Sequence, residues 1–416
     1  MVRRTGVENI GFISTRIAGT DGVSLEIEKW ATVLERNGFN CFYFAGEVDR
    51  GLDKSFKVEK AHFEHPFIKR INDSLFSELR RRPEVSSLIH DIKEDLKSSL
   101  YEFYNRFNID LVITENALSI PMNIPLGLAL TEFIAETGVK TIAHHHDFYW
   151  ERKRFFINSC YDYLRMAFPP DLPSVKHVVI NSIASKELSY RLGISNVVIP
   201  NVYNFAEEKQ VSLEKDIELK KFIGLDEDGV LVLQPTRIVP RKRIERSIEI
   251  VQNLKDFNPI LVVSHASGDE GDSYSRHIIE YAKRMNVKIV MLGQLIGSNQ
   301  SSEKKFTLAD VYNSADLVTY PSDIEGFGNA FLEAIYYKKP IVVNRYAVYV
   351  MDIEPRGFDV ISFDDMVTSD VVERIEKVLT DSGYQEAMVN HNFRVAKEFF
   401  SYEVLEKKLL SVIETF

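Results

Sequence analysis

The sequence predicts an α/β protein with two domains, each built on a doubly wound parallel sheet. Short runs rich in β-branched and aromatic residues recur along all 416 residues. Longer stretches with the apolar spacing of amphipathic helices separate these runs. The strand-like runs are nearly continuous in apolar residues rather than alternating, which is typical of parallel strands covered by helices on both faces. Because such runs occur in both halves, we expect two Rossmann-like domains of similar size.

The expected strands and helices alternate along the chain, as a parallel sheet with crossover helices requires. In the first half we expect strands at residues 10–14, 41–44, 111–114, 141–145, 177–181 and 197–200, helices at 24–37 and 120–137, and a charge-rich helical insertion at 71–107. In the second half we expect strands at residues 230–234, 260–264, 288–292, 317–320, 341–344 and 360–363, and helices at 243–254, 274–285 and 329–337.

A polar segment at residues 203–221 separates the two halves, because it lacks the apolar pattern of a strand. We therefore predict an N-terminal domain over residues 1–205 and a C-terminal domain over residues 206–390. Residues 391–416 are predicted to be helical and to pack back toward the N-terminal domain. Ligands of open parallel sheets bind at the carboxyl ends of the strands. Two such domains facing each other are thus expected to form a binding cleft.

Composition excludes several classes of protein. The chain carries 51 Lys and Arg against 61 Asp and Glu, a net charge of -10, which argues against a general nucleic-acid binder. It contains no apolar run of the length that spans a bilayer and no N-terminal apolar segment typical of a secretory signal. Its two cysteines, Cys41 and Cys160, fit a reducing interior. We therefore expect a cytoplasmic protein without a transmembrane segment, whose basic clusters serve local anionic ligands.

The segment YPSDIEGFGNAFLE, residues 320–333, combines glycines with two glutamates at the start of a predicted helix. Gly326 and Gly328 let backbone amides approach a ligand closely, and a helix N-terminus favours negative charge. Glu325 lies in the preceding loop and Glu333 about one turn inside the helix. Amides for a phosphate and carboxylates for hydroxyls are what a sugar nucleotide needs. An ordinary helix start with acidic residues in its early turns is the alternative for the glutamate pair.

A second segment, QPTRIVPRKRIER at residues 234–246, concentrates positive charge after a predicted strand on this acidic chain. Arginine and lysine donate charge-assisted hydrogen bonds to phosphate oxygens, so the local reversal of charge predicts an anion site with Arg237 and Lys242 as its main contacts. The alternative is a solvated basic helix face, which accounts for Arg243 and Arg246 equally well.

The order of these motifs resembles the retaining GT-B glycosyltransferases, the large group that includes glycogen and sucrose synthases. RIVPRK comes first and the glutamate pair of EGFGNAFLE follows; IPN at residues 199–201 and MLGQL at residues 291–295 also resemble the pattern of this family. The resemblance covers most of the chain and is most specific in residues 234–333. It implies the GT-B fold, in which two Rossmann-like domains face each other across a cleft.

The resemblance also implies an activity, namely transfer of a hexose from a nucleoside diphosphate sugar of the GDP-mannose or UDP-glucose type to a small hydroxylated acceptor. Transfer would retain anomeric configuration and require neither a metal ion nor a cofactor besides the donor. Arg237, Lys242 and Gly22, which lies in the glycine-containing loop STRIAGTDGVS, would contact the donor diphosphate. Glu333 would bind the ribose hydroxyls and Glu325 would face the transferred sugar. The implied contacts of the donor sugar and nucleotide are Gly326, Phe327, Gly328, Asn329, Glu333 and Leu295.

Three consecutive histidines in HHHDFYWERKRF end another predicted strand. Because alternate residues of a strand share a face, we expect His144 and His146 on one face and His145 on the other. A metal site would need a third ligand, which no spacing motif supplies, and buried or surface structural histidines are a second interpretation. The resemblance implies a third, in which His146 and Asp147 lie beside the transferred hexose, or His145 if the register shifts by one residue.

The basic residues after this strand bear on the acceptor. If Arg152, Lys153 and Arg154 face the predicted cleft, the acceptor is anionic and carries a carboxylate or phosphate. If they lie on a solvated helix face, they carry no information about the acceptor. We take Arg152 and Lys153 as candidate acceptor contacts.

One departure from the family pattern indicates a distinct subgroup. Many members carry a Gly-Gly pair and a following glutamate after the next strand, whereas this chain reads IVVNRYAVYVMDIEPRGF, with no glycine before Gly357. Together with HHHDFYWER, this variant is similar to enzymes that make mannosyl or glucosyl derivatives of glycerate-type solutes. A sugar-nucleotide epimerase and a non-catalytic sugar-nucleotide-binding protein remain the alternative functions.

Overall fold

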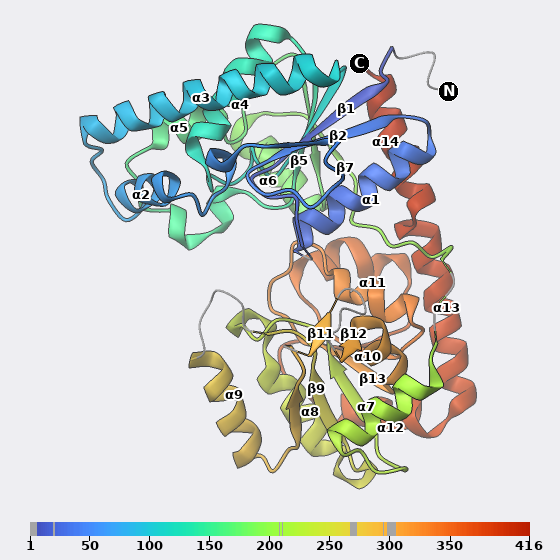
Figure 1. Cartoon of the computed structure of the whole chain (residues 1–416). Helices are drawn as coiled ribbons and strands as arrows, with labels where there is room; N and C mark the ends of the chain where they lie inside the picture. The colour runs from blue at the N-terminus through green and yellow to red at the C-terminus, as the bar shows by residue number, and fades with distance from the viewer. Residues whose placement is uncertain are drawn as a thin grey trace. The chain divides into compact units, whose positions relative to one another are not determined.

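The computed structural model describes residues 6–19, 21–207, 209, 211–266, 273–293, 295–297 and 305–416. The chain forms two compact units (Figure 1). Met1–Asn201 and Tyr402–Phe416 form the first unit, and Val202–Ser401 form the second. The units thus divide before the expected boundary at residues 205 and 206. The expected terminal segment 391–416 is shared between them.

A seven-stranded sheet in the order β3-β2-β1-β4-β5-β6-β7 forms the centre of the first unit. All its strand pairs are parallel. The strands are β1 (Asn9–Ile13), β2 (Asn40–Ala45), β3 (Ser55–Lys57), β4 (Leu111–Glu115), β5 (Lys140–His145), β6 (Val175–Val179) and β7 (Asn196–Val198). Six of them lie where the apolar runs predict strands. β3 was not expected, because its three residues, SFK, are only partly buried and form no apolar run.

Helices cover the sheet of the first unit. They are α1 (Gly22–Arg36), α2 (Pro66–Leu75), α3 (Pro83–Phe107), α4 (Ile124–Thr137), α5 (Tyr161–Ala167), α6 (Ser182–Leu192) and α14 (Tyr402–Glu414). The Asp21 side chain caps α1 by accepting from the amides of Val23 and Ser24, which satisfies two amides that have no partner within the helix. The helical insertion expected at 71–107 is divided into α2 and α3. Pro83 starts the second helix, since proline suits a first turn but not a helix interior.

The second unit contains a six-stranded parallel sheet in the order β10-β9-β8-β13-β14-β15 and a separate parallel pair, β11-β12. Its strands are β8 (Leu231–Gln234), β9 (Ile260–Val263), β10 (Ile289–Met291), β11 (Ile296–Gly297), β12 (Phe306–Thr307), β13 (Leu317–Tyr320), β14 (Ile341–Asn344) and β15 (Ile361–Phe363). Its helices are α7 (Leu213–Ile223), α8 (Ile244–Asn253), α9 (Ser273–Arg284), α10 (Leu308–Ser314), α11 (Asn329–Tyr336), α12 (Ser369–Thr380) and α13 (Ser382–Phe400).

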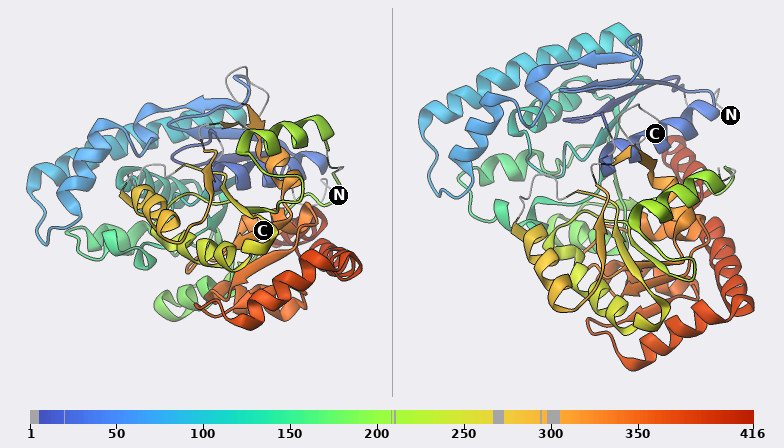
Figure 2. Two further views of the ribbon diagram at one scale, coloured as in Figure 1. Left: turned by 90° about the horizontal axis from the view of Figure 1, so that it is seen from below. Right: turned by 60° about the horizontal axis from the view of Figure 1, so that its bottom comes forward.

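Each unit has its own hydrophobic core between its sheet and its helices. Figure 2 shows the helices and strands of the chain in two further views. Strands β4, β8, β9, β13 and β14 are buried at every position, because parallel sheets with helices on both faces expose neither side to water. Among the described residues, no helix is both long enough and apolar enough to cross a membrane. Because the strands themselves are buried, we expect the polar side chains that could build a site at the carboxyl ends of the strands.

Candidate functional site

In the second unit, the basic segment predicted to bind an anion forms the loop after β8. This loop contains a short 3-10 helix, η5 (Pro240–Lys242). The buried Gln234 side chain, at the end of β8, donates through Nε2 to the carbonyl of Lys242 at 2.9 Å. The strand end therefore holds the backbone of Lys242 in place, and the Lys242 side chain is itself buried.

The buried Lys242 ammonium forms an ion pair with Glu325, which comes from the loop between β13 and α11. Arg241 adds a second positive charge, with its Nη1 3.7 Å from the other carboxylate oxygen. The amide of Asp323 donates to the carbonyl of Arg241 at 3.0 Å, so the backbones of the two loops are also joined. The structure thus brings together Lys242 and Glu325, two residues that the sequence analysis assigned to the same donor site.

The charges of this pair depend on each other. Burial favours the neutral forms of both groups, and it lowers the pKa of Lys242 despite the nearby carboxylate. For Glu325 burial acts to raise the pKa, but the Lys242 ammonium outweighs it and leaves the pKa below its usual value. Glu325 is therefore an ionised carboxylate held by fixed partners.

Arg237 differs from Lys242 in its surroundings. Its side chain is exposed, and among the described residues it has neither a hydrogen-bond nor an ion-pair partner. A guanidinium left unpaired beside a buried cation is available to an incoming anion. Arg237 and Lys242 also act together on a third residue, His265, which follows β9.

His265 was not among the site residues predicted from the sequence. Burial, with the charges of Lys242 and Arg237, lowers the pKa of this imidazole to about 4, and its Nδ1 forms a 2.7 Å hydrogen bond with the Ser264 hydroxyl. It is thus a neutral histidine beside the two cations. Its position directly after a strand of the same sheet was the signal that could have revealed it.

The glycine turn before α11 has the conformation expected of a close backbone approach. Gly328 has a φ of 118°, and a Cβ added there would lie 2.4 Å from the hydroxyl oxygen of Tyr346. That hydroxyl donates to the carbonyl of Phe327 at 2.8 Å. Only glycine satisfies both demands. Gly326 and Asn329 flank this pair, so the four residues form one continuous turn that leads into α11.

Glu333 and Leu295 lie in different surroundings from the ion pair. Glu333, on α11, accepts a 2.8 Å hydrogen bond from the buried Tyr312 hydroxyl. Leu295 accepts through its carbonyl from the amides of Lys305 and Phe306, at 3.0 and 3.1 Å. These contacts neither support nor contradict the nucleotide-binding roles that the resemblance implies, which stay predictions.

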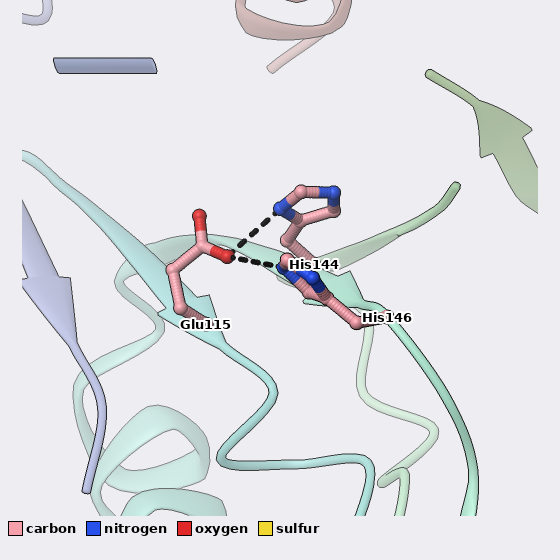
Figure 3. Close-up of side chains that lie close together, drawn as sticks. All are labelled: Glu115, His144 and His146. Carbon is pink, nitrogen blue, oxygen red and sulfur yellow. Dashed lines mark hydrogen bonds and ion pairs between the residues drawn. The ribbon is translucent and has the colours of Figure 1, made fainter. Parts of the chain in front are cut away.

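In the first unit, the histidine run ends β5, and its register with β4 creates a second polar cluster. Glu115, the last residue of β4, is paired with His144 across the two parallel strands. Nδ1 of His144 and Nε2 of His146 lie 2.8 Å and 3.0 Å from the same Glu115 carboxylate oxygen, Oε2. Figure 3 shows both imidazoles directed at that oxygen. Glu115 was missed by the sequence analysis; it supplies the third side chain that a metal interpretation lacked.

Burial and hydrogen bonding set the charges in this cluster. Glu115 and His144 are 0% and 1% exposed. Burial acts to raise the pKa of Glu115, but the two imidazoles outweigh it and lower that pKa to about 2. Burial lowers the pKa of His144. It acts in the same direction on His146, where the hydrogen bond to Glu115 outweighs it and the pKa is raised.

His145 lies on the opposite face, which confirms the predicted alternation. Its ring forms hydrogen bonds with the Ser119 hydroxyl through Nδ1 and, at 2.9 Å, with Nδ1 of His177 through Nε2. All three side chains are buried. Burial leaves the pKa of His145 well below its usual value, so this ring is neutral.

Asp147 and the basic residues after it form a separate group. Asp147 forms an ion pair with Arg152 and accepts from the Asn116 side chain at 3.0 Å, so His146 and Asp147 are each held by other residues. Lys153 is exposed in a 3-10 helix, η4 (Lys153–Phe155). Gly22 opens α1, and a Cβ there would meet no atom within 4 Å. The acceptor role of Arg152 and Lys153 and the diphosphate role of Gly22 stay predictions.

The fold is that of the GT-B glycosyltransferases. The structure of a glycosyltransferase from Rickettsia africae is similar with a TM-score of 0.71 at 15% identity, covering 98% of each chain. A sucrose-phosphate synthase from Thermosynechococcus elongatus is similar with a TM-score of 0.68 at 13% identity, again covering 98% of each chain. These similarities confirm the predicted fold class of two Rossmann-like α/β units.

Sequence relatives then identify the family. Residues 215–394 match the family described as glycosyl transferases group 1. The chain is 34% identical to the mannosylglucosylglycerate synthase of Thermotoga maritima, over 95% of this chain and 97% of that protein. It is also 34% identical to a synthase of the same name from Petrotoga mobilis, over 85% of this chain and 86% of that protein. The chain belongs to the group 1 glycosyltransferases, which confirms the resemblance inferred from its motifs.

Proposed function

We propose that this glycosyltransferase moves a hexose from a nucleoside diphosphate sugar, of the GDP-mannose or UDP-glucose type, to a small glycerate-type acceptor. The observation that carries the proposal is the 34% identity to a mannosylglucosylglycerate synthase along nearly the full length of both proteins. The name of that relative contains a mannosyl unit and a glucosylglycerate, so we favour mannosyl transfer to glucosylglycerate over the other pairings.

The second unit supplies the groups for the donor. Lys242, held at the end of η5 beside Glu325, and the exposed Arg237 would bind the diphosphate. Positive charges fixed before the reaction stabilise the charge that develops on the leaving diphosphate. We therefore propose that the diphosphate needs no metal ion. Glu325 would accept hydrogen bonds from hydroxyls of the transferred sugar and Glu333 from those of the ribose, while Leu295 and the turn from Gly326 to Asn329 would contact the donor.

The proposed reaction retains anomeric configuration. The bond between the anomeric carbon and the diphosphate oxygen breaks, and the acceptor oxygen bonds to that carbon on the same face. The acceptor proton passes to an oxygen of the leaving diphosphate. His146 and Asp147 would lie beside the reacting sugar, and Arg152 and Lys153 would face the acceptor carboxylate, which their positive charge suits.

The test is a product analysis with the purified full chain. GDP-mannose, UDP-glucose and ADP-glucose are each supplied with glucosylglycerate, with glycerate or without acceptor, and products are followed by NMR. We expect a mannosylated glucosylglycerate with the anomeric configuration of the donor. Inversion would overturn the retaining step, and an altered sugar nucleotide formed without acceptor would indicate an epimerase. Binding of donor without product in any mixture would indicate a non-catalytic sugar-nucleotide protein.

The role of the metal ion is tested separately by binding. Calorimetry with GDP should give the same affinity in Mg²⁺ and in EDTA, because the protein's own cations neutralise the diphosphate. A matched Lys242→Met variant should bind GDP more weakly in both buffers. Affinity that depends on Mg²⁺ in the wild-type protein would contradict metal-independent donor binding.

A further inference from the structure

We propose that Glu115, His144 and His146 form a binding site for a divalent transition-metal ion in the first unit. Among the described residues, these three are the histidine, cysteine or acidic side chains that lie close enough together to share a cation. One ligand atom of each lies within 4.8 Å of the others. The inference does not depend on the proposed donor or acceptor, because it concerns one sheet edge and is tested without sugars.

Sheet register builds the site. Glu115 and His144 are direct neighbours on the paired strands β4 and β5, and His146 follows two residues after His144. Residues two apart on extended backbone face the same side. The three side chains therefore converge because of the strand pairing itself, which places them before any ligand binds.

The distances suit a cation. The two imidazole nitrogens lie 2.8 Å and 3.0 Å from Oε2 of Glu115. Adjacent ligand atoms around a six-coordinate ion with bonds of about 2.1 Å lie about 3 Å apart. The same distances suit hydrogen bonds. A cation site and a hydrogen-bonded triad therefore differ in the charge and the hydrogen bonds that the carboxylate needs.

The burial and the hydrogen bonds of Glu115 favour a cation. Glu115 is 0% exposed, and the described residues place two imidazoles beside its carboxylate but pair no lysine or arginine with it. A buried charge needs a compensating charge. In addition, Oε1 of Glu115 has no hydrogen-bond partner among the described residues. A cation bound by both carboxylate oxygens would use the unpaired oxygen and supply a permanent charge, which the imidazoles supply only by holding a second proton.

Neighbouring residues hold the ligands in place. Trp30 of α1 stacks on His144 with ring centroids 4.1 Å apart, and the Asn116 side chain accepts from the His146 amide at 3.1 Å. Such outer contacts orient metal ligands in known sites. Two imidazoles and one carboxylate suit Zn²⁺, Fe²⁺, Co²⁺ or Mn²⁺ better than Mg²⁺ or Ca²⁺, which prefer oxygen ligands alone. His146 is the most exposed of the three, at 12%, so further coordination positions open on its side.

The experiment is metal uptake by the untagged full chain after treatment with EDTA and its removal. Zn²⁺ or Mn²⁺ is added by equilibrium dialysis, and bound metal is measured by mass spectrometry. We expect one tightly bound ion per chain and a rise in thermal unfolding temperature with Zn²⁺. E115Q and H146Q should lower the affinity by at least a hundredfold and abolish that rise. The matched control is H277A, which breaks the pair between the exposed His277 of α9 and Glu245 of α8 and should leave uptake unchanged.

Several outcomes would overturn the inference. Uptake by the wild-type chain no greater than by E115Q would show that the cluster is a hydrogen-bonded triad without a cation, as would uptake that survives in H146Q. Because the buried variants could fail to fold, circular dichroism checks each one, and Co²⁺ provides a readout on the wild-type chain alone. Ligand-field absorption typical of histidine ligation is expected at one equivalent of Co²⁺, and its absence would also refute the site.

Discussion

Two buried carboxylates, one in each unit, are neutralised in different ways. Glu325 in the second unit faces the ammonium of Lys242 and the guanidinium of Arg241. Glu115 in the first unit faces two imidazoles. Lysine and arginine carry permanent charges at neutral pH, whereas an imidazole is charged only when it holds a second proton. Charge balance is therefore built into the second unit, but in the first it depends on a proton or a bound cation.

The largest expected effect comes from removing the permanent cation of the second unit. Lys242→Met would leave Glu325 buried without its main partner, and breaking one side of such a pair costs about 3–5 kcal/mol of unfolding free energy. Chemical denaturation measures this loss. The double variant Lys242→Met/Glu325→Gln should recover most of the stability but not the transferase activity. A single variant as stable as the wild type would show that the pair does not hold the loops.

The next largest effect is a loss of transfer rate without a loss of stability. Arg237→Ala removes an exposed side chain, so unfolding free energy should change by no more than about 0.5 kcal/mol. The transfer rate should fall about a hundredfold if Arg237 stabilises the leaving diphosphate, which corresponds to about 3 kcal/mol. Steady-state kinetics with the donor varied measures the rate. Arg284→Ala, which alters an exposed ion pair on α9, is the control and should change neither quantity.

A smaller effect tests the turn that carries Glu325 toward α11. Gly328→Ala would combine a strained backbone, at about 1–2 kcal/mol, with a collision between Cβ and the Tyr346 hydroxyl. Gly357→Ala is a matched control, because Gly357 also has a positive φ of 84° but open space around it. We expect Gly328→Ala to be the less stable variant in thermal unfolding. Equal destabilisation of the two would mean that Tyr346 moves aside.

The carboxylate of the second unit, Glu325, contributes to the pH dependence of stability. The pKa of Glu325 is lower in the folded chain than its ordinary value of 4.5, so below about pH 4.5 the unfolded chain binds a proton that the folded chain does not. Its contribution is fully present above that pH and is lost as the pH falls through the folded pKa. Unfolding free energy should therefore fall less steeply between pH 5 and pH 3.5 in Glu325→Gln than in the wild type. Parallel curves would contradict the shift.

The smallest effect concerns the thiols, which report on the first unit alone. Burial raises the pKa of Cys41 and that of Cys160 to about 12, so almost no thiolate forms at pH 8 and neither should react with a disulfide reagent in the native state. Both cysteines lie in the first unit. Thiol labelling in increasing denaturant thus follows opening of that unit, and rapid labelling without denaturant would refute their burial.

The sequence predicted the main strands well because parallel strands covered on both faces are continuous apolar runs. β4 and β9 lie within one or two residues of their expected bounds. β3 and the two-residue strands β11 and β12 carry no such run and could not be found. The alternating faces of His144, His145 and His146 followed from strand geometry alone.

The site residues that were not predicted from the sequence were missed for the same reason. The approach of Glu115 to His144 depends on which strand lies beside β5 and in what register, and a single sequence does not reveal either. The pairing of Lys242 with Glu325 could be expected because both motifs resembled one family site. His265 belonged to no such motif, and its neutral state depends on burial and on two cations that only folding brings near.

The return of the chain to the first unit through α14 has a consequence for biosynthesis. α14 buries Leu405, Leu409, Val412 and Ile413 and packs against α1, so the first unit is completed by a helix that follows the second unit in the sequence. Residues of the second unit are contiguous and all emerge from the ribosome before α14 does. The nascent chain can therefore complete its second unit while the first still exposes the apolar surface that α14 covers.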